Sequence, residues 1–268
     1  MMRKVLFLLF VFFGGQGGSA NAADFDHQVW GSLLQKHVHL INGGKASQVD
    51  YQGFVDDKVL LEGYLMRLSR VDRGQFDTLG KNEQLAFLIN AYNAWTVNLI
   101  LTKWPDIASI KDLGSLFSSP WSKKFIPLLG EKRSLDNIEH KLIRGSGRYN
   151  DPRIHFAVNC ASIGCPALGN QAYQGTNIET LLKQQTQLFL SDRSRNYIEG
   201  DTLKLSSIFK WYREDFEKGW HGYYSLEDFL VAHAHDLSLS SDITNQLKNK
   251  SFDIDFLDYD WQLNSKSQ

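Results

Sequence analysis

The sequence predicts a helix-rich α+β fold, with a single domain built around a small antiparallel sheet. Several long segments repeat apolar residues at helical spacing, whereas the alternating segments typical of strands are few and short. Hydrophobic residues make up 43% of the 268 residues and charged residues 22%, which is typical of a chain with a sizeable core. No internal repeat, low-complexity tract or long linker divides the chain.

The first 22 residues have the layout of a secretory signal peptide. The basic pair Arg3-Lys4 precedes an apolar run over 5–13, and small residues follow, ending in Ala20-Asn21-Ala22. A membrane span needs about 20 apolar residues, so this run is too short for a stable one. We expect a signal peptide over 1–22, one domain over 23–268, and a periplasmic or secreted protein. A retained membrane anchor is the alternative.

Charge and composition narrow the function classes. The chain has 29 basic and 30 acidic side chains, which argues against a dedicated nucleic-acid binder because such proteins carry a basic surplus. Aromatic residues reach 13%, enough for a large core and a concave pocket. No zinc motif, phosphate loop or dinucleotide fingerprint is present, and only His233 and His235 beside Asp236 suggest a metal. We therefore expect no metal and no cofactor.

Helices are expected where apolar residues recur every three to four positions. The segment over 82–103 is the longest, and it must end before Pro105 because a proline disfavours helical backbone in the residue before it. Apolar residues cover most of its sides, so we expect it to be central. A capping box is expected at Thr176 and Glu179. The other helical segments are 25–34, 60–68, 134–142, 181–190, 207–216 and one after 225.

Strands are expected in four short places. Residues 48–51 and 153–158 read as extended, and 197–205 reads as a hairpin that turns at Gly200-Asp201. The tail over 252–261 alternates aromatic and acidic residues, and we expect it to pack back as an edge strand.

The two cysteines allow two interpretations. Cys160 and Cys165 are the only ones, and an exported protein meets conditions that permit a disulfide between them. In the other interpretation, the predicted strand over 153–158 delivers Cys160 to a turn whose backbone N–H groups lower the thiol pKa and bind an oxyanion. Such a thiol needs a nearby base or cation to act as a nucleophile.

Two histidines compete for the role of base. In a strand, His155 and Cys160 would point to opposite faces about 16 Å apart, unless the chain bends sharply at Asn159. His140 has no such restriction, but its neighbour Glu139 cannot easily orient it because adjacent side chains on a helix diverge. The candidate sets are therefore Cys160–His155–Glu139, or Cys160–His140 with an acid from elsewhere, such as Glu83.

The predicted central helix also carries polar residues that are candidates for the site. Glu83 and Asn90 share a face, with Asn93 about 60° away. Three polar side chains on a buried helix must find hydrogen-bond partners. Asn90 and Asn93 are candidates for the floor of a substrate site or for oxyanion donors, and a structural network that joins the helix to the sheet is the equal alternative.

Five stretches of the chain stand in a specific order: 85–94 (LAFLINAYNA), 138–140 (IEH), 156–162 (FAVNCAS) with Cys165-Pro166, 208–212 (IFKWY) with Asp215-Phe216, and 259–264 (YDWQLN). Together they resemble the DUF547 family, whose domains are named for their unknown function.

What the resemblance implies is a thiol site. A site made of Cys, His and Glu is similar to the sites of papain-like or transglutaminase-like proteins. The resemblance therefore implies a papain-like or transglutaminase-like fold. In plant members the position matching Cys165 is often Ser while that matching Cys160 stays Cys, which favours Cys160 as the functional thiol. Plant members also tend to lack the residue matching His155 while keeping the Glu-His pair, which favours His140.

Three hypotheses follow. The first is an exported thiol hydrolase or acyltransferase, in which Cys160 attacks an amide or thioester of an unknown peptide-like substrate. The second is a non-catalytic binding or scaffold module with a Cys160–Cys165 disulfide. The third is a redox pair, although redox pairs usually have two intervening residues rather than four.

Overall fold

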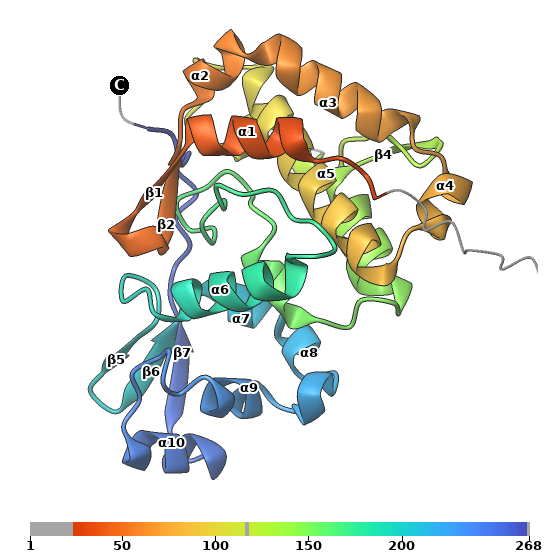
Figure 1. Cartoon of the computed structure of the whole chain (residues 1–268). Coiled ribbons are helices and arrows are strands. Elements are labelled where there is room, and N and C mark those ends of the chain that lie inside the picture. Colours follow the sequence, from red (N-terminus) through yellow and green to blue (C-terminus); the bar gives the residue numbers. More distant parts are fainter. Residues whose placement is uncertain (1–23, 116–117, 267–268) are drawn as a thin grey trace, which may run out of the picture.

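The structure is a computed structural model that describes residues 24–115 and 118–266. The predicted signal peptide over 1–22 lies outside the described residues. Among them, helices dominate and the strands are short, so the predicted helix-rich α+β class is confirmed (Figure 1).

The N-terminal half is a helical layer packed around one central helix. That helix, α5, is buried along almost its whole length, as the sequence predicts, and it ends before Pro105. Helices α2 and α3 contact α5, and α1 contacts α3 (Figure 1). The helices of this half are α1 (Gln28–His37), α2 (Tyr51–Asp56), α3 (Lys58–Arg70), α4 (Arg73–Thr78) and α5 (Lys81–Leu101).

The C-terminal half packs short helices around a second core. Phenylalanine rings fill this core, among them Phe156, Phe189, Phe209 and Phe229. The predicted capping box before α6 is wrong, because the N-cap is Asn177 and its side chain does not cap the helix. Helix α10 (Ser241–Lys248) is not among the helices predicted from the sequence. The helices of this half are α6 (Ile178–Leu190), α7 (Ser207–Trp211), α8 (Arg213–Phe216), α9 (Leu226–Ala232) and α10 (Ser241–Lys248).

The strands form three small sheets in the described residues rather than one. Two are antiparallel hairpins, β1 (Val38–Ile41) with β2 (Ala46–Val49), and β3 (Ile126–Leu128) with β4 (Glu131–Arg133). The third has the order β5-β6-β7 and is mixed, because β7 runs parallel to β6. Its strands are β5 (Tyr197–Glu199), β6 (Thr202–Leu205) and β7 (Asp253–Phe256), which confirms the predicted hairpin and the edge strand in the tail.

The predicted strand over 153–158 is wrong. Pro152–Phe156 is a 3₁₀ helix, η6, with proline at its start and the Asp151 side chain accepting a hydrogen bond from Arg153 N–H. Proline suits the first turn of a helix because its φ is already helical and it has no N–H to leave unpaired. Every residue from 152 to 159 is buried, so the alternation in the sequence does not mark two faces. The compact turn removes the argument that His155 and Cys160 must lie far apart.

The helix that carries Glu139 and His140 is also unusual. Asn137–Ile143, η4, has π-helical hydrogen bonding, and Ser134 Oγ accepts a hydrogen bond from Asn137 N–H at its start. A π-helix turns less per residue than an α-helix because each bond spans one more residue, and such turns are frequent at functional sites. Adjacent side chains therefore diverge less than the sequence analysis assumes.

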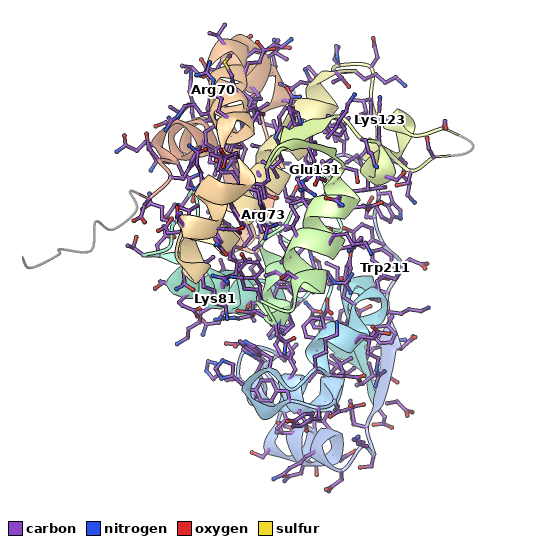
Figure 2. All side chains as sticks on the ribbon, turned by 90° about the vertical axis from the view of Figure 1, so that its right-hand side faces the viewer. Arg70, Arg73, Lys81, Lys123, Glu131 and Trp211 are labelled. Carbon is purple, nitrogen blue, oxygen red and sulfur yellow. A yellow bond between two sulfur atoms is a disulfide. The ribbon has the colours of Figure 1, made fainter. Side chains whose placement is uncertain are left out.

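The two cores meet at a boundary that crosses the molecule. Charged side chains such as Arg70, Arg73 and Glu131 project from the N-terminal half, whereas Trp211 lies at the junction of the halves (Figure 2). Trp211 is 46% exposed, which is high for tryptophan. In the described part of the chain, no helix combines the length and hydropathy that crossing a membrane requires.

Candidate functional site

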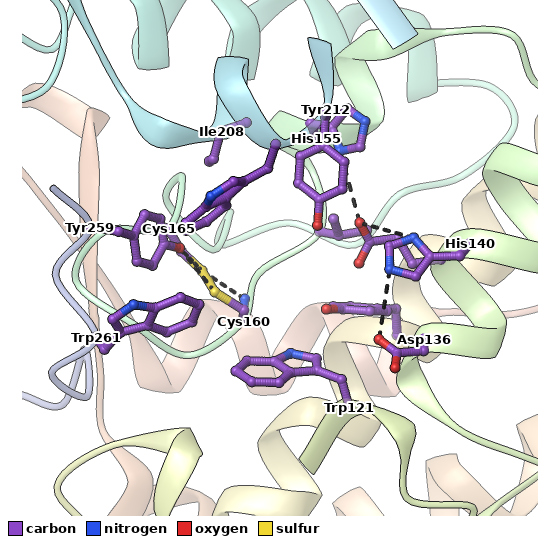
Figure 3. Close-up of a pocket in the computed structure, with 14 residues that line it drawn as sticks. Trp121, Asp136, His140, His155, Cys160, Cys165, Ile208, Tyr212, Tyr259 and Trp261 are labelled. Atoms are coloured by element: carbon purple, nitrogen blue, oxygen red, sulfur yellow. Dashed lines mark hydrogen bonds and ion pairs between the residues drawn. A yellow bond between two sulfur atoms is a disulfide. The ribbon is translucent and has the colours of Figure 1, made fainter. Parts of the chain in front are cut away.

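A cavity of about 200 Å³ lies at the junction of the two cores (Figure 3). Its wall combines residues of the first core, such as Tyr92 and Val158, with residues of α7 and the C-terminal segment. Four of the predicted site residues line it: Glu139, His140, His155 and Cys160. The other lining residues are Tyr92, Trp121, Asp136, Val158, Cys165, Ile208, Trp211, Tyr212, Tyr259 and Trp261.

Cys160 stands on a tightly held turn at one side of the cavity. It forms a disulfide with Cys165, and its N–H donates a hydrogen bond to the Cys165 sulfur at 2.8 Å. The next residue, Ala161, has a φ of +62°, a left-handed conformation that is uncommon for a residue with a Cβ. The side chain of Asn159 accepts from Ala161 N–H at 2.8 Å and donates to Pro166 O, so it holds the turn in this strained shape.

The C-terminal segment after β7 closes over this turn. Ser162 pairs with Leu263 in an antiparallel bridge, and Gly164 N–H donates to Asp260 O. The hydroxyl of Tyr259 thereby lies 3.1 Å from the sulfurs of both cysteines. A Cβ on Gly164 would lie 2.9 Å from the Tyr259 ring, so only glycine allows this close approach.

His155 is held by a carboxylate that the sequence analysis does not assign to the site. Its Nε2 lies 2.7 Å from Asp215 Oδ2, and its ring stacks on Tyr212 with centroids 3.9 Å apart. Burial lowers the pKa of His155, which favours the neutral ring. A neutral ring that donates from Nε2 to Asp215 keeps an unprotonated Nδ1, and that atom makes no hydrogen bond with any described residue.

His140 and His155 lie on the far side of the cavity from the sulfurs (Figure 3), and Glu139 lies between these two histidines. Its Oε1 is 3.9 Å from His155 Nδ1 and 3.9 Å from His140 Nδ1, too far for a hydrogen bond to either ring. The carboxyl group is buried, and Oε1 has no hydrogen-bond partner in the described residues. Glu139 therefore does not hold the imidazole as the sequence analysis expects, because Asp215 already does.

His140 has a different set of neighbours. Its Nδ1 lies 2.9 Å from Arg144 Nη1, and since a guanidinium can only donate, Nδ1 is the acceptor and the ring proton sits on Nε2. That Nε2 is 3.7 Å from Asp136 Oδ1. His140 and Glu139 line the same cavity, but Glu139 makes no hydrogen bond to His140, in agreement with the expectation that it does not orient this ring.

Asn90, Asn93 and Glu83 do not line the cavity. The side chain of Asn90 bonds Tyr173 through both O and N–H, and that of Asn93 bonds Ala157 O at 2.9 Å and Asn159 N–H at 2.8 Å. Glu83 accepts from Gly175 N–H, away from the cavity. The side chains of Asn90 and Asn93 hydrogen-bond backbone groups, which agrees with the structural network that was the equal alternative to a substrate-binding role. Asn93 instead supports the Cys160 turn through Asn159.

Residues 76–190 match the family described as "Protein of unknown function, DUF547". This match confirms the resemblance to the DUF547 family over 76–190. No curated protein and no solved structure matches the chain. The matched range includes Glu139, His140, His155 and Cys160, whereas Asp215 and Tyr259 come after its end.

Two residues that complete the site have no predicted role. Asp215 and Tyr259 both occur in stretches that carry the family resemblance, but neither has a predicted role at the site. Within 24–115 and 118–266, no group of three or more metal-ligating side chains is found. His233 binds Asp236 at 3.0 Å, while the His235 ring is fully exposed.

Proposed function

We propose that this protein is an exported thiol-dependent hydrolase or acyltransferase acting on an amide or thioester of a peptide-like substrate. The observation that carries the proposal is that one cavity presents both the Cys160 sulfur and the carboxylate-bound imidazole of His155. A thiol, an imidazole and an orienting carboxylate are the groups that papain-like chemistry uses. Export rests on the signal-like residues 1–22.

In this proposal the disulfide is the resting form, and a dithiol reductant opens it. His155 Nδ1 takes the Cys160 proton, and the thiolate attacks the substrate carbonyl to form a carbon–sulfur bond. The leaving amine or thiol departs with that proton. Water, or an acceptor amine, then attacks the acyl-thioester and releases the Cys160 thiol. Tyr259 O–H and Cys160 N–H lie beside the sulfur and can donate to the oxyanion.

His140 is the second candidate for the proton transfer. Arg144 donates to Nδ1 of His140, so the ring proton is on Nε2, which lies 3.7 Å from Asp136 Oδ1. A protonated Nε2 suits a proton donor to the leaving group better than it suits a base. Replacing each histidine by alanine separates these roles. Loss of the base should slow thiol alkylation itself, whereas loss of an acid should slow only acyl transfer.

Labelling of the reduced protein with iodoacetamide tests the proposal. Cys160 should label first, with a pH midpoint well below the free-thiol value of about 8.5. Cys165→Ser should label at Cys160 without reductant, and reduced wild type should accept the acetyl group of p-nitrophenyl acetate there. Equal, slow labelling of both cysteines, or no acetyl-enzyme in either protein, would overturn the proposal.

The second candidate function is a binding or scaffold module, and the specific observation that favours it is the Cys160–Cys165 disulfide, which leaves no free thiol. In this case the disulfide persists under the redox conditions of the protein's compartment, and Cys160→Ser together with Cys165→Ser preserves its biological effect. Mass spectrometry of the native protein without reductant, combined with complementation by the double variant, distinguishes the two functions.

A further inference from the structure

The turn that carries the two cysteines is fixed by more than their disulfide. Cys160 and Cys165 are five residues apart, so the bond closes a short loop and contributes little loop-closure entropy. Ile163 N–H and Gly164 N–H both donate hydrogen bonds to carbonyl groups of the C-terminal segment, independently of the sulfurs. The bond can therefore open while both sulfurs keep their places in the cavity wall.

The two sulfurs differ in access. Both cysteines line the cavity, but Cys160 is partly exposed, whereas Cys165 is only 4% exposed. A thiolate that opens a disulfide must reach the sulfur that it attacks, so access selects one of the two sulfurs. An incoming thiolate meets the Cys160 sulfur, and the Cys165 sulfur is then the leaving group.

The Cys165 sulfur has the hydrogen-bond donors that a leaving thiolate needs (Figure 3). Cys160 N–H donates to it at 2.8 Å, and Tyr259 O–H donates to it at 3.1 Å. Tyr259 is equally close to the Cys160 sulfur, whose other neighbour is the Ser162 hydroxyl at 3.4 Å, so the backbone N–H makes the difference between the sulfurs.

Both donors favour the broken bond over the intact one. Burial raises the pKa of Tyr259, so its hydroxyl keeps its proton at neutral pH. A hydrogen bond to a charged acceptor is about twice as strong as one to a neutral acceptor. The two donors therefore stabilise a Cys165 thiolate more than they stabilise the disulfide.

We infer that the cysteine pair carries out thiol–disulfide exchange, in which a dithiol attacks the Cys160 sulfur and Cys165 leaves as a thiolate bound by Cys160 N–H and Tyr259 O–H. The incoming sulfur bonds to Cys160 as the bond between the two cysteines breaks, which gives a mixed disulfide. The second thiol of the reductant then attacks the first reductant sulfur, and Cys160 leaves. The dithiol gives up two electrons and two protons and becomes a disulfide, and the protein gains them as two thiols.

The reductant needs two thiols because Cys165 competes with it. After the first step Cys165 stays beside Cys160 in the fixed turn, so its thiolate can attack the mixed disulfide and close the original bond again. A second thiol on the same reductant is also held close to its target and completes the reduction. This reaction needs no acyl substrate, so it goes beyond the proposed function and would supply the free thiol that the proposed function requires.

Single-cysteine variants and the neutral probe 2-hydroxyethyl disulfide test which sulfur is attacked. By microscopic reversibility, the thiol that forms the mixed disulfide faster is the sulfur that an incoming thiolate attacks. Mass spectrometry should show Cys165→Ser forming the adduct at Cys160 at least about tenfold faster than Cys160→Ser forms it at Cys165. Equal rates, or a faster reaction at Cys165, would overturn the inference.

Removal of one hydroxyl tests how the leaving group is stabilised. Tyr259→Phe keeps the ring in place and should slow reduction of the disulfide by dithiothreitol about threefold to tenfold, because a hydrogen bond to a developing negative charge is lost. Tyr224→Phe is the matched control, since this ring is 74% exposed and outside the wall, and its rate should equal that of wild type. Reduction of Tyr259→Phe as fast as wild type, or faster, would overturn the inference.

The two proposals can fail separately. Exchange with the expected preference for Cys160, but without an acetyl-enzyme in the reduced protein, would sink only the proposed function. An acetyl-enzyme in the reduced protein, together with equal adduct rates at the two cysteines, would sink only this inference.

Discussion

The imidazole of His155 and the carboxylate of Asp215 form a buried pair, with Nε2 2.7 Å from Oδ2. The two side chains are 1% and 9% exposed. Arg144 and Lys218 also bind Asp215. Burial alone would raise the pKa of Asp215, but the hydrogen bonds from His155, Arg144 and Lys218 outweigh burial and hold this pKa well below its usual range.

Asp215→Asn should therefore cost stability as well as activity. The amide leaves Arg144 without its buried counter-charge, and breaking such a pair costs about 3 kcal/mol of unfolding free energy. Because the folded pKa of Asp215 is lowered, its contribution is present above the unfolded value of about 3.9 and is lost as pH falls below it. Urea denaturation should thus show wild type and variant converging below about pH 4.

Asp77→Asn is the matched control for that variant. Asp77 pairs with Arg73 on an exposed helix face, where both side chains are at least half exposed. Such pairs are worth about 0.5 kcal/mol or less, so this substitution should leave the unfolding free energy nearly unchanged. Similar losses in Asp215→Asn and Asp77→Asn would contradict the structural role given to the His155–Asp215 pair.

The helices could be predicted because their signal is local. The apolar positions of 82–103 specify the central helix α5 within two residues at each end, and Pro105 marks where it must stop. The strand predicted over 153–158 is wrong for the opposite reason. Its apolar residues are buried on all sides, and Pro152 with the Asp151 cap selects a 3₁₀ turn that alternation cannot reveal.

The site could be predicted only in part, since its geometry depends on contacts between distant segments. Cys160, His155, His140 and Glu139 do share one cavity. His155 is held by Asp215, which is 60 residues further along the chain, and Cys160 contacts Tyr259, which is 99 residues further along. No spacing rule connects such positions. The π-helical hydrogen bonding of Asn137–Ile143, which carries Glu139 and His140, is equally invisible to a prediction at 100° per residue.

His27 should make the protein acid-sensitive. Its Nδ1 bonds Tyr64 Oη at 2.7 Å in the first core, and burial lowers its pKa to about 4 from 6.5. A lowered histidine pKa means that the unfolded chain binds more protons, so stability is full above about pH 6.5 and falls as pH drops toward 4. At pH 5 the loss should be about 2 kcal/mol relative to pH 7, and His27→Gln should remove that part of the slope.

His155 contributes a slope of the same sign, because burial lowers its pKa too. The His27→Gln variant should therefore retain some acid sensitivity. His235→Gln changes a fully exposed ring and should leave the pH profile of unfolding as in wild type. A profile unchanged by His27→Gln would show that His27 is solvated in the native protein.

Gly164→Ala should push the Tyr259 ring off the cysteine turn. The added Cβ would meet that ring at 2.9 Å, and relieving such overpacking costs about 1–3 kcal/mol. Gly63→Ala is the matched control, since nothing lies within 4 Å of a Cβ there and the site is inside α3. It should gain up to about 1 kcal/mol through helix propensity. Chemical denaturation measures whether the unfolding free energy falls in Gly164→Ala and rises in Gly63→Ala. A stabilised Gly164→Ala would contradict the close approach of Tyr259.

Asn93→Ala should loosen the Cys160 turn without touching the cavity. Its amide binds Ala157 O and Asn159 N–H, both buried, so removing it leaves two unpaired backbone groups at a cost of about 2–4 kcal/mol. Asn159 then loses the anchor that keeps Ala161 in its left-handed conformation, and the reduced Cys160 should alkylate with a different rate and pH midpoint. Asn98→Ala, at a partly exposed position of α5, should change neither property. If both variants unfold alike while Cys160 labels as in wild type, the turn is held by the C-terminal segment rather than by Asn93.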